Sequence, residues 1–173
     1  MSSNAVAPVD EFLDFACLTY RGDDDPDRRA RAESLLAVHP TWPSENVWVA
    51  AAIGDLAALR AHLASHPNAA TRSGGPRDWG PLLYACYSRV LIPAADAPGV
   101  VQALLAAGAD PNSGFSLWDS RFTALTGAMG EGERGIERQP PHADAHPIAD
   151  RLLEAGASAN DPQGLYNTMH RAD

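Results

Sequence analysis

Apolar residues in this chain recur in short segments with the spacing of one helix face, and each segment is followed by a glycine or a proline. The clearest case is the segment 104–112, LLAAGADPN, which returns with the same spacing as LLEAGASAN at 152–160. The paired leucines predict the buried end of a helix, and the glycine after the last apolar position predicts a left-handed C-cap, which other residues resist. A repeated helix-plus-stop unit is typical of proteins built from stacked repeats.

Helical spacing of apolar residues predicts further helices in the first part of the chain. One is expected at about 10–20, and a second begins at Asp25-Pro26, where Asp is the N-cap and Pro occupies the first helical position. A third and a fourth helix are expected at 46–54 and 56–63. Because the last two are adjacent and short, they are interpreted as the inner and outer helices of one unit.

Two later segments carry the opening of a repeat unit, GPLLYAC at 80–86 and TALTGA at 123–128. Together with the helix ends at 104–112 and 152–160, they resemble the ankyrin-repeat family. Units of that family open with Thr-Pro-Leu-His-x-Ala-Ala and close with Leu-Leu-x-x-Gly-Ala-x-x-Asn. The resemblance implies an all-α fold, an ankyrin-repeat-like solenoid of stacked antiparallel helix pairs joined by hairpin-like finger loops.

The units depart from the family pattern in several places. Extra residues lie between the helices of two units, near 88–96 and around 130–142, and the fingers 71–79 and 113–122 are longer than the family norm. The expected division is a disordered tail at 1–8, a degenerate capping repeat at 9–44, repeats at 45–79, 80–122 and 123–164, and the start of a truncated repeat at 165–173. We therefore expect a fragment or a short array that is monomeric, with an end-to-end dimer as the alternative.

Composition narrows the class of partner. The chain has 173 residues and a formal net charge of -9, which argues against nucleic acid and anionic membranes because both attract cationic surfaces. No basic segment followed by an apolar run opens the chain, and no apolar run reaches the roughly 20 residues that span a bilayer. The two cysteines are too few for a disulfide scaffold. We expect a cytoplasmic protein.

Three clusters of chemically active residues have simpler interpretations. The segment 130–135 matches G-x-G-x-x-G, but a helix precedes it, so we expect a flexible inserted loop and not a dinucleotide site. The acidic run 23–27 has Arg28 where a calcium-binding EF-hand loop needs Gly, so a solvated turn is expected. Cys17 and Cys86 occupy small-residue positions two units apart, and we expect buried thiols beyond disulfide reach. No cofactor is expected.

The segment 142–146 has the composition of a metal site, with His142, Asp144 and His146 close together. Prolines flank it on both sides, which disfavours the helix that would bring both histidines to one face. The main interpretation is that Asp144 is the N-cap of the next helix. The alternative is a metal-dependent enzyme, or its regulatory domain, in which these three residues hold a metal that activates water.

The preferred function is a non-catalytic protein–protein interaction module, a scaffold or adaptor that binds a protein partner through its finger loops and concave inner-helix face. Arg and Trp are enriched at binding hot spots, and here they concentrate in the two fingers of an otherwise acidic chain. The residues expected to contact the partner are Trp48, Arg72, Arg77, Trp79, Phe115, Trp118 and Arg121. A finger tryptophan more often packs against its own loop, and an exposed tryptophan that anchors a partner is the alternative on which this site depends.

Overall fold

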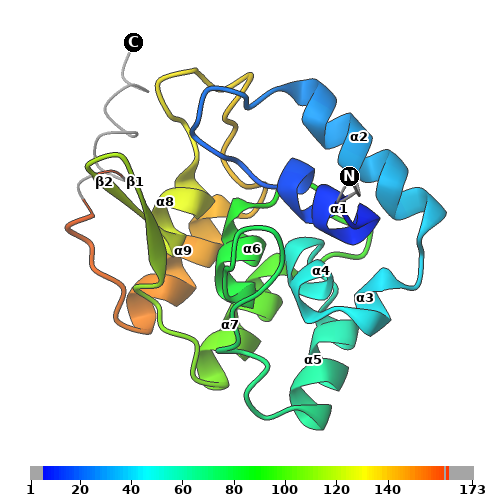
Figure 1. The fold of residues 1–173 in the computed structure, drawn as a ribbon. Helices are drawn as coiled ribbons and strands as arrows, with labels where there is room; N and C mark the ends of the chain where they lie inside the picture. Colours follow the sequence, from blue (N-terminus) through cyan, green and yellow to red (C-terminus); the bar gives the residue numbers. More distant parts are fainter. Residues whose placement is uncertain (1–5, 162, 164–173) are drawn as a thin grey trace, which may run out of the picture.

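The computed structural model describes residues 6–161 and 163, which form a helical protein with one small β-sheet (Figure 1). The elements in chain order are α1 (Pro8–Ala16), α2 (Pro26–Val38), α3 (Trp42–Glu45), α4 (Val47–Ala52), α5 (Leu56–Ser65), α6 (Pro81–Tyr87), α7 (Ala97–Ala106), β1 (Gly114–Leu117), β2 (Ser120–Thr123), α8 (Ala124–Met129) and α9 (Ala145–Glu154). Within the described ranges, no helix has the length and apolar character needed to cross a membrane.

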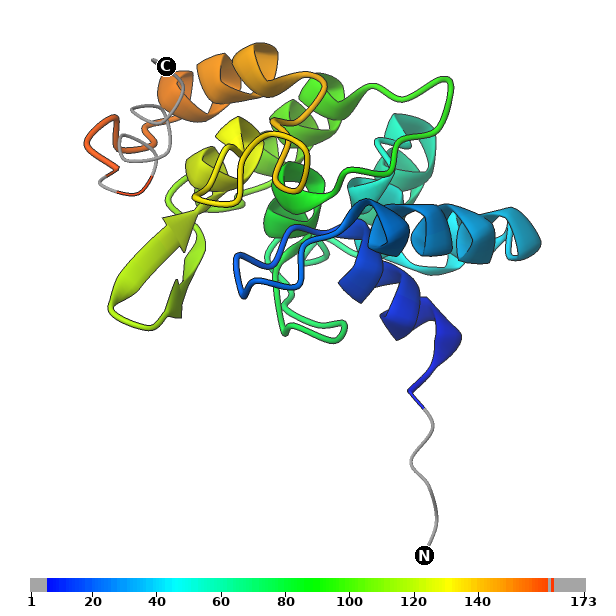
Figure 2. The same cartoon turned by 90° about the horizontal axis from the view of Figure 1, so that it is seen from above.

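The helix α6 lies at the centre of the molecule, and all seven of its residues are buried. It packs between α4 and α8, while α7 packs between α5 and α9 (Figure 1, Figure 2). The helices α1 and α2 pack against each other and cover the α4 end of this arrangement. Because these helices are short, burial against neighbours stabilises them more than their own propensity does.

Aspartate side chains cap the first turns of several helices, and the cap at Asp25 was predicted from the sequence. Asp25 accepts a hydrogen bond from the backbone N–H of Asp27 at 2.9 Å, and Pro26 occupies the first helical position. Asp55 and Asp96 cap α5 and α7 in the same way. Each cap satisfies a backbone donor that the first helical turn leaves without an intrahelical partner.

Glycines end α7 and α9 where the repeated motif predicts. Gly108 has a φ of 94° and Gly156 a φ of 98°, both in the left-handed region that only glycine adopts without strain. The first leucine of each pair, Leu104 or Leu152, is fully buried. The two predicted helix ends are therefore confirmed.

The first helix is shorter than predicted, because the chain leaves it to pair with a distant segment. The helix α1 ends at Ala16, and Cys17 forms an isolated antiparallel bridge with Ser88. Leu18 N–H donates to the Tyr87 carbonyl at 3.0 Å, and Arg89 N–H donates to the Ala16 carbonyl at 2.8 Å. Residues 17 and 18 are thus paired with the chain that follows α6.

The second finger is a β-hairpin. β1 and β2 pair antiparallel with Phe115 opposite Phe122, and Trp118-Asp119 connects them. Trp118 has a φ of 52°, the left-handed backbone that tight two-residue turns use. The two phenylalanine rings stack at 5.5 Å between centroids, and Phe115 also lies 4.7 Å from Trp79. Aromatic cross-strand pairs of this kind stabilise a short hairpin.

The prediction of an all-α ankyrin-repeat-like solenoid is wrong as a fold class, because the structure contains this sheet and a less regular set of helices. The physical reasons are local. Phe115 and Phe122 favour paired strands, the added residues near 88–96 and 130–142 lengthen the connections, and α1 is tied to Ser88 by backbone pairing. The fold is described better as packed short helices with one hairpin.

Some expectations concern residues without a described structure. The truncated repeat at 165–173 lies outside the described residues, and so do positions 1–5 of the expected tail. Pro8, which the sequence assigns to the tail, is the first residue of α1. Cys17 and Cys86 are both buried and free, as predicted. The reason given for their separation fails, since Cys17 pairs with the residue two positions after Cys86.

Gly127 provides a test of the packing between α6 and α8. A Cβ at this position would collide with the ring of Tyr87, which is fully buried and whose hydroxyl donates to the Thr123 carbonyl at 2.8 Å. Gly127→Ala is expected to lower the free energy of unfolding by about 1–3 kcal/mol, because overpacking outweighs the better helix propensity of alanine. Urea denaturation measures this change.

Gly80→Ala is the matched control, because a Cβ there has no heavy atom within 4 Å. We expect it to change stability by less than about 0.5 kcal/mol. Equal stabilities for the two variants would show that Tyr87 is not held in the way described.

Candidate functional site

The predicted partner-binding residues lie on the helix α4, on the loop after α5 and on the β1–β2 hairpin. The loop after α5 and the β1–β2 hairpin extend from the same side of the molecule (Figure 2). Arg72 belongs to the loop after α5 and contacts Trp48 on α4. The Trp48 indole N–H donates to the backbone carbonyl of Arg72 at 3.2 Å, and the Arg72 guanidinium lies 4.9 Å from the centroid of the Trp48 ring. Trp48 is half-buried and Arg72 is exposed. The loop therefore presents a cation stacked on an indole.

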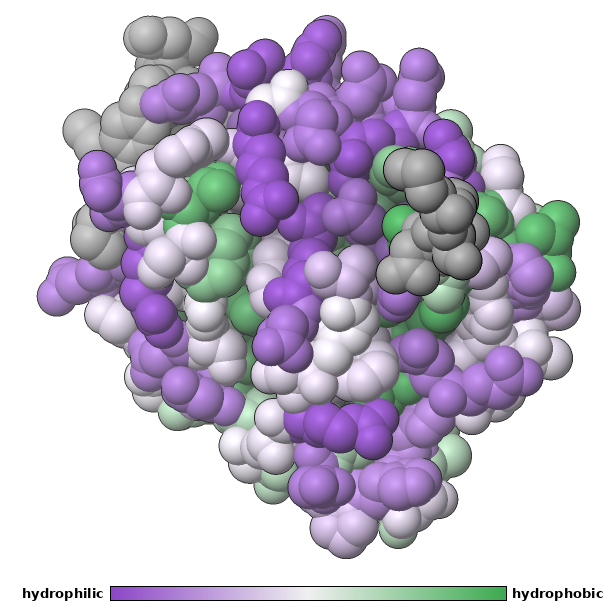
Figure 3. All heavy atoms as spheres, viewed as in Figure 1, coloured by the Kyte–Doolittle hydropathy of each residue, from purple (hydrophilic) through white to green (hydrophobic). Residues whose placement is uncertain are grey.

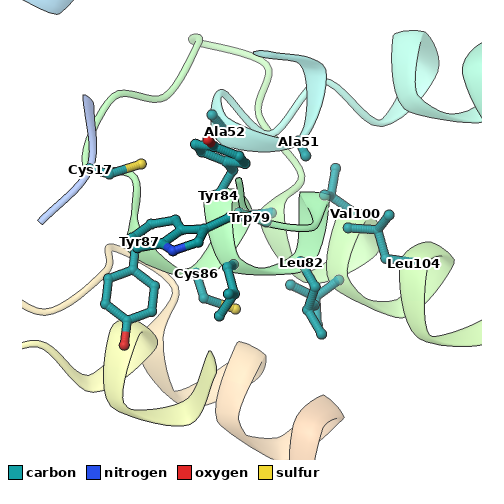
Figure 4. Packing of buried hydrophobic residues seen from close by; sticks show 14 of the residues in the cluster. Cys17, Ala51, Ala52, Trp79, Leu82, Tyr84, Cys86, Tyr87, Val100 and Leu104 are labelled. Carbon is teal, nitrogen blue, oxygen red and sulfur yellow. The ribbon is translucent and has the colours of Figure 1, made fainter. Parts of the chain in front are cut away.

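Trp79 and Arg77 belong to the framework of the fold. Trp79 is 5% exposed, and its ring lies between Tyr84, Tyr87 and Phe115 (Figure 4). The Arg77 guanidinium forms an ion pair with Asp14 at 2.7 Å and is largely buried. Neither side chain is free to contact a partner in this structure. The enclosed Trp79 ring corresponds to the alternative in which a finger tryptophan packs against its own surroundings.

The hairpin presents the other predicted contacts. Trp118 at its tip is 74% exposed, a large exposure for an indole in an ordered turn. Arg121 is exposed, and its guanidinium donates to the Asn112 carbonyl at 2.9 Å. Phe115 is half-buried and contributes packing under the hairpin. Trp118 and Arg121 are accordingly the accessible residues of this projection.

A hollow of about 480 Å³ lies beside the hairpin, and we call it the hairpin hollow. Its walls come from the hairpin, from the turn after α1, from the inserted loop between α8 and α9, and from Gln163 after α9. The lining residues are Tyr20, Arg21, Gly22, Trp118, Ser120, Phe122, Gly132, Glu133, Arg134, Gln139 and Gln163. Figure 3 shows apolar side chains reaching the surface next to the hairpin, on a face that is otherwise largely hydrophilic.

A buried carboxylate joins two of these walls. Asp24 is 2% exposed and accepts hydrogen bonds from the N–H groups of Thr19 at 2.7 Å and Tyr20 at 2.9 Å, and from the Gln139 amide at 2.7 Å. The side-chain oxygen of Gln139, Oε1, accepts a hydrogen bond from the backbone N–H of Arg134 at 3.2 Å. Buried polar groups that are satisfied in this way rigidify their surroundings. The inserted loop is therefore held in place and is not the flexible loop that was predicted.

Arg89 holds the far end of the same loop. Its guanidinium donates to the carbonyl oxygens of Pro140 at 2.8 Å, Gly127 at 2.6 Å and Cys86 at 3.1 Å. Burial lowers the pKa of the Arg89 guanidinium. The three backbone carbonyls take the place of the water that would solvate the guanidinium in the unfolded chain. Arg89 therefore connects α6, α8 and the inserted loop by hydrogen bonds.

Tyr20 forms the inner wall of the hollow. Its φ is 56°, and its ring lies 4.9 Å from Phe122 and 6.2 Å from Tyr87. Burial raises the pKa of the Tyr20 phenol well above its usual value, so the hydroxyl stays protonated. Among the residues that the structure describes, this hydroxyl has no hydrogen-bond partner. Tyr20 thus offers an unused donor beside the hollow.

Two arginines stand on the rim. Arg21 and Arg134 are exposed, and neither guanidinium forms an ion pair or hydrogen bond with any described side chain. The Arg134 guanidinium lies over Gly22, where an added Cβ would approach its Nη2 to 2.8 Å. Gly22 has a φ of 96°, so the backbone conformation at this position favours glycine.

The histidine segment does not form a metal site. His142 is buried, and its Nδ1 accepts the Asp144 N–H at 3.0 Å, while His146 is exposed. Asp144 stands at the N-cap position of α9, but its side chain makes no capping hydrogen bond, which corrects that part of the prediction. Within the described ranges, no three His, Cys, Asp or Glu side chains are placed to hold a metal ion.

Burial controls the titration of the remaining reactive groups. It lowers the pKa of His142 to about 3, with a smaller contribution from the charge of Arg89, so the ring is neutral. It raises the pKa of Cys17 and of Cys86 to about 12, so neither is a thiolate nucleophile at neutral pH. These groups support the fold and offer no acid–base or nucleophilic chemistry near pH 7.

Sequence reasoning missed the residues that build the hollow. The acidic run was interpreted as a solvated turn, yet Asp24 within it is buried and fully bonded. No sequence pattern around Gln139 indicates its function, because its side chain bonds to Asp24, which lies 115 positions away in the chain. The only available indication was the length of the inserted loop, because long loops in small domains often have a function.

Comparisons with protein-family profiles, with curated proteins and with solved structures give no match for this chain.

Acid should destabilise the fold through His142. Its pKa is about 3 in the fold and about 6.5 in the unfolded chain, so the unfolded state binds the extra proton as pH falls through 6.5. The contribution of neutral His142 to the free energy of unfolding is fully present above about pH 7, and it is lost as the pH falls from about 6.5 to 3. From pH 7 to pH 5 we expect a loss of about 2 kcal/mol that His142→Gln does not show. Urea midpoints at the two pH values measure it.

His66→Gln is the control, because His66 is exposed at the C-cap of α5. This variant should keep the full pH dependence of the natural chain. An identical pH dependence in His142→Gln would contradict the assignment of His142 as a neutral buried ring.

Gln139→Ala tests the bridge under the hollow. The substitution removes a donor to the buried Asp24 carboxylate and the acceptor of the Arg134 N–H. We expect the free energy of unfolding to fall by about 1–3 kcal/mol, because a buried carboxylate loses a partner. Hydrogen exchange at the Arg134 amide should accelerate. Gln102→Ala, on the exposed face of α7, should change neither quantity, and equal effects of the two variants would refute the bridge.

Proposed function

We propose that this chain is a non-catalytic protein–protein interaction module whose partner docks on the side that carries the hairpin and the loop after α5. The observation that carries the proposal is the exposure of Trp118 at the tip of an ordered hairpin. An exposed indole on a rigid support is a favourable anchor, since it buries a large area on binding at little cost in conformational entropy.

The hairpin that presents Trp118 is fixed from below, so its tip is preorganised. Thr123 and Thr126 both donate to the buried carboxylate of Asp161, and the Tyr87 hydroxyl donates to the Thr123 carbonyl. The Phe115–Phe122 stack holds the strands on the core. Preorganisation lowers the entropy cost of binding and favours a small projecting element as a recognition site.

The pair formed by Arg72 and Trp48 supplies a second contact on the same side of the molecule. Arg121 adds a third exposed group. Arginine and tryptophan are enriched at the energetic centres of protein interfaces. The proposal therefore keeps Trp48, Arg72, Trp118 and Arg121 as partner contacts and leaves Arg77 and Trp79 in the framework. It places the activity in the cytoplasm on the sequence alone.

Trp118→Ala should weaken partner capture. Truncation of a hot-spot tryptophan costs about 2 kcal/mol or more, which corresponds to about a thirtyfold increase in Kd. The full chain serves as bait in lysate of its source cells, and the variant is checked for retained helicity by circular dichroism. Val38→Ala is the control because Val38 is 69% exposed on the distant end of α2.

A photo-crosslinking amino acid at Ser116, on the exposed face of β1, should trap the same partner, whereas one at Ser34 on α2 should not. Capture and crosslinking that do not differ between the two sites would overturn this placement of the partner.

A further inference from the structure

We infer that the hairpin hollow is a binding site for a small aromatic carboxylate, an activity separate from protein docking on the hairpin tip. The volume of about 480 Å³ lies within the range of ligand sites in proteins, which is roughly 300–1,000 Å³. Walls from the hairpin, the turn after α1 and the inserted loop enclose it. A concave site of this size accommodates a bicyclic ring better than a flat protein surface.

Aromatic side chains form the apolar part of the site. Phe122 and Tyr20 are buried, and their rings lie 4.9 Å apart at a tilt of 40°. Trp118 also lines the hollow and, at 74% exposed, keeps most of its ring available for a ligand. Rings that stack or meet edge to face at 4.5–7 Å stabilise each other beyond the area they bury. These three side chains therefore favour a planar aromatic ligand.

The charges at the rim favour an anion. The chain has a net charge of -9, yet two arginines and one acidic residue, Glu133, line the hollow. The guanidiniums of Arg21 and Arg134 have no ion-pair partner among the described residues, so both can bind an anionic group in the hollow. A guanidinium binds a carboxylate through two parallel hydrogen bonds, which matches a ligand carboxylate at this position.

The inner part of the hollow supplies a third independent observation. The Tyr20 hydroxyl is buried and has no hydrogen-bond partner among the described residues. An unsatisfied buried donor is costly, and such groups in native proteins commonly mark a place that a ligand or water completes.

The support beneath the site is rigid. The bridge from Asp24 through Gln139 to the Arg134 N–H fixes the backbone that carries one rim arginine relative to the turn that carries the other. Gly132 allows this close packing, because a Cβ there would approach Tyr20 to 2.8 Å. Groups that are held before a ligand arrives bind it at a lower entropy cost.

The test uses the full chain and 2-naphthoate as the probe, with binding followed by isothermal titration calorimetry. We expect saturable binding with one site per chain. Arg21→Gln/Arg134→Gln should raise the Kd by about tenfold or more, since it removes both guanidiniums. Arg60→Gln, on the exposed face of α5, should leave the Kd within about twofold. Thermal unfolding of each variant checks that the fold is retained.

Naphthalene-2-carboxamide, which has the same ring without the charge, separates the ring contribution from the charge contribution. It should bind the natural chain about tenfold more weakly than 2-naphthoate and should bind the double variant equally well as the natural chain. Absence of 2-naphthoate binding at millimolar concentration would overturn the proposal, and so would equal affinity of the natural chain for both probes. Partner capture by the double variant reports on protein docking separately, because Trp118 is intact in it.

Discussion

The packing of one aromatic side chain, Tyr87, constrains most of this structure. Its ring contacts those of Trp79, Phe115 and Tyr20, and its hydroxyl holds the backbone at the end of β2. Through these contacts the last residue of the central helix positions the loop before α6, the hairpin and the turn after α1. The burial of such rings provides the large apolar area on which a domain of this size depends.

The parts of the fold that the sequence predicts are those that depend on neighbouring residues. The caps at Asp25 and the glycine stops at Gly108 and Gly156 act within one helical turn, so the local pattern determines them. The prediction of the fold class was wrong because the ankyrin-like motifs lie in the helices and carry no information on the structure of the finger loops. In the second finger, Phe115 and Phe122 form a strand pair that local periodicity over four residues does not distinguish from a loop.

The candidate site was less predictable for a physical reason. Trp118 and Arg121 were predicted to contact a partner because Arg and Trp concentrate in the fingers, and the structure exposes both side chains. Trp79 carries the same local signal, but its position beside α6 encloses it. The hollow depends on Asp24, Gln139 and Tyr20, whose roles arise from the packing of three separate segments. No pattern in any one segment reports such an arrangement.

The hydrogen bond between Asp24 and Gln139 joins residues that are 115 positions apart in the chain. During synthesis Asp24 leaves the ribosome long before Gln139 is translated. The Asp24 carboxylate therefore stays solvated until the inserted loop has been made. Contacts of such large sequence separation close late, because their loop entropy is compensated only after the intervening helices have packed. The central helices can therefore pack first, and the hollow is completed only when the inserted loop packs against the turn after α1.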